Sequence, residues 1–117
     1  MSQPPDRDAM RQEMVRTAFQ KKAVSRLPAA EVLKLGIEFF KERGYRAGMT
    51  GRPNQMFVMG GREGIIPRVN GEISARADVG RPGVTLVTMD GFGEKLGPTM
   101  EAFHQELRNQ RKKAMGQ

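Results

Sequence analysis

The sequence predicts an α+β domain: two N-terminal helices, then a four-stranded antiparallel meander, then a long C-terminal helix that packs on the sheet in a loosely helix-grip-like, two-layer arrangement. Apolar residues recur at spacings of three and four before residue 44 and after residue 96. Between these points the period changes to two, and residues 44–97 carry 12 of the 14 glycines, which separate short strands as turns do. Such a sheet needs one covered face, which the flanking helices can supply.

The beginning of the chain is expected to be irregular and then helical. Residues 1–8 are predicted to be a disordered lead-in, because they contain two prolines and few apolar side chains. Residues 9–117 are predicted to form a single domain, since this length supports one core but not two. A helix is predicted over residues 9–25, where Met10 and Met14 begin an apolar series at a spacing of four.

A second helix is predicted to begin near Pro28 and to end before Gly44. Proline is tolerated in the first turn of a helix, and glycine is a common stop signal just beyond the last turn. Gly36 lies inside this helix at a cost of about 1 kcal/mol relative to alanine, which indicates that another element packs closely there. The broad apolar stripe consists of Val32, Leu33, Leu35, Ile37, Phe39 and Phe40.

Strands are predicted over residues 45–50, 55–59, 68–76 and 84–89, and a last helix over 98–113. The third strand has an alternative, because Asn70-Gly71 between apolar runs also favours a two-residue hairpin. A continuous strand is preferred, since the alternation stays in phase through Gly71 and Pro67 suits the start of a strand. Gly71 would then mark a bulge or a close approach to the backbone. No motif in the sequence identifies a family.

Composition restricts the chemistry. The formal net charge is +7, spread along the chain without a dense basic tail, which favours anionic partners. Cysteine is absent, so no thiolate metal site or thiol nucleophile is possible. No catalytic residue, metal site or cofactor is predicted, and the chain is expected to be a non-catalytic, cytoplasmic protein. No apolar run approaches the roughly 20 residues that a membrane span needs.

The remaining polar groups give weak signals. His104, the single histidine, is expected on the surface of the last helix beside Phe103. Backbone N–H groups at the start of that helix could hold an anion, but Asp90 and Glu94 would repel a phosphate. Glu63 could converge with these two carboxylates, although nothing in the spacing requires it.

The arginines give the main functional hypothesis, a basic surface for nucleic acid or another anionic partner. Five of them, Arg46, Arg52, Arg68, Arg76 and Arg81, are the candidate binding residues. In a meander the turns that carry Arg52 and Arg81 share one end of the sheet, whereas the other three are expected on its exposed face. Few aromatics accompany them, because Tyr45 and Phe57 are expected in the core, which weakens the case for base stacking.

Two alternatives remain open. Five methionines near the predicted seam between sheet and helix could line a pocket for a small apolar ligand; they are Met49, Met56, Met59, Met89 and Met100. The predicted helix over residues 9–25 could instead bind a protein partner through its apolar side.

Overall fold

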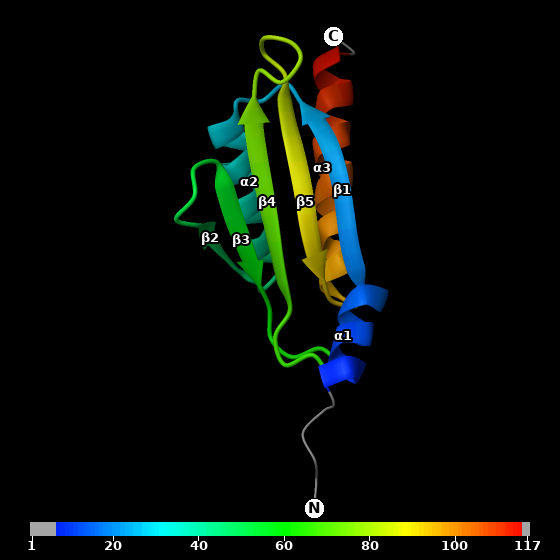
Figure 1. Ribbon diagram of the computed structural model, residues 1–117. Helices are drawn as coiled ribbons and strands as arrows, with labels where there is room; N and C mark the ends of the chain where they lie inside the picture. Colours follow the sequence, from blue (N-terminus) through cyan, green and yellow to red (C-terminus); the bar gives the residue numbers. More distant parts are fainter. Residues whose placement is uncertain (1–6, 116–117) are drawn as a thin grey trace, which may run out of the picture.

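The computed structural model describes residues 7–115 as an antiparallel sheet with the second and third helices on one side and the first helix beyond the end of the sheet (Figure 1). The helices are α1 (Arg7–Arg16), α2 (Ala29–Glu42) and α3 (Leu96–Met115). The strands are β1 (Ala18–Ser25), β2 (Arg46–Met49), β3 (Gln55–Met59), β4 (Asn70–Ala77) and β5 (Thr85–Phe92). The predicted two-layer α+β class is therefore confirmed. No helix in this part of the chain is long and apolar enough to cross a membrane.

The sheet has five strands rather than the predicted four, in the order β1-β5-β4-β3-β2. Strands β2 to β5 form the expected meander, and β1 is added beside β5 through eight antiparallel residue pairs. The predicted first helix over residues 9–25 is wrong in its second half, because residues 18–25 are β1. The predicted lead-in is helical at Arg7 and Asp8, and its remaining residues, 1–6, lie outside the described part.

Hydrogen bonds of Thr17 end α1 just before β1 begins. The Thr17 side chain donates a hydrogen bond to the carbonyl oxygen of Glu13 at 2.8 Å, and its backbone N–H bonds the same oxygen at 3.0 Å. The Thr17 hydroxyl oxygen also accepts a bond from the N–H of Gly93 at 3.1 Å, at the end of β5. One side chain thus closes the last turn of the helix and sets the start of the β1–β5 pairing.

The core lies between the sheet and the helices α2 and α3. Two glycine contacts explain how closely these layers approach. A Cβ at Gly36 would lie 2.7 Å from the Met56 sulfur, so the close packing predicted from this glycine is confirmed. Gly71 and Gly91 are paired across β4 and β5, and a Cβ on either would lie 3.1 or 2.8 Å from the Met100 sulfur of α3. Gly71 therefore lies within β4, and the hairpin alternative at Asn70-Gly71 is wrong.

We call the side of the sheet away from α2 and α3 the open face. Side chains alternate along each strand, so every second one lies on this face. In β4, Gly71, Ile73 and Ala75 are buried under the helices, whereas Glu72 and Arg76 are exposed. The same alternation along β3 buries Met56 and Val58. This parity decides which of the candidate residues share a surface.

Candidate functional site

Three of the five candidate arginines lie on the open face. Arg46 pairs across strands with Met59, and the Arg68 guanidinium lies 3.2 Å from the Met59 sulfur, so both cations flank one thioether. Arg76 pairs with Leu86 at the other end of β4. All three arginines are exposed. The face thus has two basic zones, one at each end of β4.

Two carboxylates lie between these zones. Glu72 and Asp90 are direct cross-strand partners and both are exposed. The Gln55 amide donates a hydrogen bond to the Glu72 carboxylate at 3.1 Å. Within residues 7–110, the ion pairs join other groups, so the charges of this face are not neutralised by each other at contact distance. Like charges placed directly opposite on two strands repel, so this pair opposes the binding of an anion at the centre of the face.

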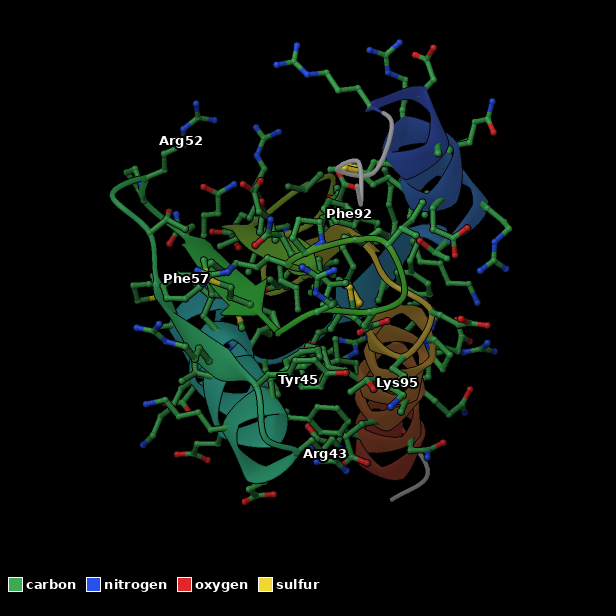
Figure 2. All side chains as sticks on the ribbon, turned by 90° about the horizontal axis from the view of Figure 1, so that it is seen from below. Arg43, Tyr45, Arg52, Phe57, Phe92 and Lys95 are labelled. Carbon is green, nitrogen blue, oxygen red and sulfur yellow. The ribbon has the colours of Figure 1, made fainter. Side chains whose placement is uncertain are left out.

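Phe57 lies on the open face, so its predicted place in the core is wrong. It pairs with Glu72 on one side and Gly48 on the other, and its ring lies 3.2 Å from the position that a Gly48 Cβ would occupy. The run from Met56 to Met59 is apolar throughout, so alternation gave no signal there. Tyr45, by contrast, lies among the helices as predicted, with its ring centroid 6.2 Å from that of Phe40 (Figure 2).

The two turn arginines share one end of the sheet but are held in different surroundings. Arg81 lines a surface hollow with Arg26 and Val24 beside the end of β1. Arg52 belongs to the turn between β2 and β3 at the opposite edge, where it points away from the sheet (Figure 2). The strand order places two strands, β5 and β4, between these surroundings. Arg81, in the turn between β4 and β5, therefore lies on the β1 side of this end, whereas Arg52 lies at the β2–β3 side.

The five candidate methionines do not line one space. Met56, Met89 and Met100 are fully buried, and they fill the seam between sheet and helices. Met59 lies on the open face beside Arg68. Met49 is 51% exposed at the edge strand β2. In the described residues the methionines of the seam therefore act as core packing. Met49 borders a hollow between α2 and β2, and Met89 contributes to the lining of another beside β1.

The Glu63 carboxylate lies at the start of α3. Glu63 accepts a hydrogen bond from the backbone N–H of Lys95 at 2.7 Å, in the turn that opens α3. A carboxylate at a helix N-terminus is favourable, because the unpaired N–H groups there carry partial positive charge. The possible anion site of the sequence analysis is thus occupied by Glu63, which joins the β3–β4 loop to α3.

His104 is buried, at 7% exposure, and its predicted place on the helix surface is wrong. Its Nε2–H donates to the carbonyl oxygen of Lys22 at 3.0 Å, and its Nδ1 has no partner among the described residues. Beside it, the Lys21 ammonium contacts the Glu101 carboxylate at 2.6 Å, and this hydrogen bond lowers the pKa of Glu101. These residues attach α3 to the outer side of β1. No group of three potential metal ligands occurs in residues 7–115.

A groove lies at the opposite edge, between α2 and β2, with a volume of about 470 Å³. We call it the edge groove. Its apolar lining includes Leu33, Ile37 and Met49, and its charged lining is Lys34, Glu38 and Lys41. Sequence periodicity could not reveal it, because these residues read as one side of an ordinary amphipathic helix.

Comparison with known proteins gave no match to a family model, to a curated protein or to a solved structure.

Proposed function

We propose that this chain is a non-catalytic binding module that holds an anionic partner on the open face of its sheet. The observation that carries this proposal is the position of Arg46, Arg68 and Arg76, which are exposed on one face and form no ion pair with the acidic side chains of residues 7–110. Arginine suits such a role, because its planar guanidinium binds phosphate or carboxylate oxygens through two parallel hydrogen bonds.

Phe57 favours single-stranded nucleic acid among the anionic partners. Its ring is half-buried on the same face, between the β2 edge and the centre of the sheet. Base stacking on an aromatic side chain contributes about 1–3 kcal/mol per base and tolerates any sequence. The carboxylates of Glu72 and Asp90 would repel phosphates, so the backbone of the bound strand is expected to contact the two basic zones and to avoid the centre.

The proposal can be tested by titrating fluorescein-labelled single-stranded DNA and RNA at two salt concentrations. The triple variant Arg46→Ala, Arg68→Ala, Arg76→Ala is expected to bind about tenfold or more weakly at low salt, since each phosphate contact releases counterions. Binding by the unmodified chain should fall steeply as salt increases.

A matched control keeps the net charge change identical. Lys34, Lys41 and Arg108 are exposed on α2 and α3, on the other side of the sheet from the open face, and are replaced by alanine together. This control should retain most of the affinity. Equal losses in the two triple variants would mean that only the overall charge matters, and an absence of binding at low salt would refute the proposal.

A further inference from the structure

The outer edge of β2 presents unpaired backbone groups. The N–H of Thr50 donates to the carbonyl oxygen of Gln55 at 3.0 Å, which makes these two residues a hydrogen-bonded pair in the β2–β3 register. Hydrogen-bonded and non-bonded pairs alternate along antiparallel strands, so Gly48 bonds to β3 while Ala47 and Met49 direct their N–H and C=O groups outward. Since β2 is the last strand of the sheet, no strand within residues 7–115 pairs with these groups.

The other edge of the sheet follows the same alternation. The N–H of Gly93 donates to the carbonyl oxygen of Thr17 at 3.4 Å, which predicts that Lys22 directs its backbone groups outward from β1. The Lys22 carbonyl oxygen indeed accepts its hydrogen bond from His104 of α3. The alternation that directs the backbone groups of Ala47 and Met49 outward from β2 is thus observed at β1 as well.

The edge groove lies on the side of β2 to which these residues point. Ala47 and Met49 belong to the helix side of the sheet, because Met49 pairs with the buried Met56. In a strand added to this edge, the residue directly across from Met49 would place its side chain on the same side, toward α2. Leu33 and Ile37 would then receive an apolar side chain, while the backbone of the added strand bonds Met49.

The charges around this edge favour an acidic strand. Lys34 and Lys41 outnumber Glu38 in the lining of the groove, and the nearby β2–β3 turn adds Arg52, whereas Arg43 pairs with Glu42 and Arg46 belongs to the open face. Two copies of the chain joined edge to edge would bring these basic groups together, which opposes self-association. In a partner with alternating apolar and acidic side chains, the apolar ones can fill the groove and the acidic ones can lie near the basic groups.

We propose that the β2 edge and the edge groove bind an extended acidic peptide segment of a partner protein by strand addition. Main-chain hydrogen bonds to Ala47 and Met49 hold the segment, and one or two apolar side chains enter the groove. The bound segment is short, since β2 is only four residues long. This site is separate from the anionic partner proposed for the open face, and either could exist without the other.

The test begins with a displayed library of random seven-residue peptides, selected on the full chain. Enriched sequences should alternate apolar residues with Asp or Glu, and a synthesised member should shift the NMR signals of Ala47, Met49 and Ile37. Selection that yields no such pattern, or peptides whose signals map elsewhere, would overturn the proposal.

Substitutions in the edge then separate backbone from side chain. Met49→Pro removes an outward N–H, a change that edge strands tolerate, and it should weaken the selected peptide about three- to tenfold through the lost hydrogen bond. Met49→Ala keeps the N–H and should weaken binding less. Ile37→Glu alters the groove without changing β2 and should also weaken binding. It therefore tests the proposal even if the Met49→Pro variant does not fold.

Two further outcomes identify a wrong occupant or a wrong site. A concentration-dependent dimer that Met49→Pro abolishes would show that a second copy occupies the edge, and the peptide proposal would fail. The double variant Arg68→Ala, Arg76→Ala should leave peptide affinity unchanged while it weakens nucleic acid. Loss of both activities in that variant would contradict the separation of the two sites.

Discussion

The two edge strands of the sheet, β1 and β2, differ in how the rest of the chain covers them. At β1, α3 lies behind the strand on the covered side of the sheet (Figure 1). There His104 bonds the Lys22 carbonyl and Glu101 pairs with Lys21. At β2, the strand is four residues long and borders the edge groove, with Met49 half exposed.

This difference shows which part of the molecule is available for strand pairing. An uncovered edge strand is a template for another chain, and proteins ordinarily shorten, charge or cover it. This chain covers β1 with a helix and only shortens β2, with arginines nearby. We therefore interpret the contact between β1 and α3 as part of the packing that stabilises the fold, and the β2 edge as the proposed binding surface.

The largest expected effect is on the covered side. Phe103 of α3 is fully buried, with ring centroids 5.2 and 5.6 Å from those of Phe39 and Phe40. Phe103→Ala should lower the free energy of unfolding by about 3–5 kcal/mol, because it leaves a cavity where α3 meets α2. Urea denaturation measures this loss, and the exposed control Val15→Ala should change stability by less than about 0.5 kcal/mol. A small loss in the Phe103 variant would mean that α3 is not anchored as described.

A smaller loss is expected where α3 packs over the glycine pair. A Cβ at Gly91 would lie 2.9 Å from the Asn70 carbonyl oxygen and 2.9 Å from the Gly71 Cα, which are backbone atoms that cannot move freely. Gly91→Ala should destabilise the fold by about 1–3 kcal/mol through overpacking.

Gly61 provides the matched control for Gly91. No atom lies within 4 Å of its added Cβ, and its φ is outside the positive range, so Gly61→Ala should be neutral or slightly stabilising in thermal unfolding. A neutral Gly91→Ala variant would contradict the close approach of β4, β5 and Met100.

The sequence predicted the fold class and most of the sheet, and its errors have physical causes. Strands β2 to β5 were predicted because glycine-rich turns separate runs of period two. β1 was missed because Lys21 and Lys22 break its alternation, and because Ala18 continues the apolar spacing of the preceding helix. Residues 18–25 become a strand through pairing with β5, which a local pattern cannot reveal.

The candidate surface was predicted only in part. Arg46, Arg68 and Arg76 were placed on the exposed face correctly, since the alternation of apolar and polar residues is clear along residues 45–49 and 68–76. The orientation of Phe57 was wrong because every residue from Met56 to Met59 is apolar, so the strand pattern has two equivalent phases. The edge groove depends on how α2 lies beside β2, which is set by tertiary packing rather than by either segment alone.

The smallest effect concerns the surface ion pair of the covered edge. The hydrogen bond from Lys21 lowers the pKa of Glu101 in the folded state. The resulting stabilisation is fully present above the ordinary glutamate pKa of about 4.3 and is lost as the pH falls through the lowered value. Because both side chains are 44% exposed, the coupling should be only about 0.2–1 kcal/mol at pH 7.

A double-mutant cycle with Lys21→Met and Glu101→Gln measures this coupling at pH 7 and again at about pH 2, below the reference glutamate pKa. The coupling should be present at pH 7 and nearly absent in acid. A coupling that persists unchanged in acid would show that the pair does not act through the ionised carboxylate.

Amide hydrogen exchange of the free, full chain by NMR tests the open β2 edge most directly. The amides of Ala47 and Met49 should exchange quickly, while those of Gly48 and Thr50, bonded to β3, should be protected. This alternation would confirm both the register and an edge available for an added strand. Protection of Ala47 and Met49 in the free chain would show that the edge is already covered and would contradict the account.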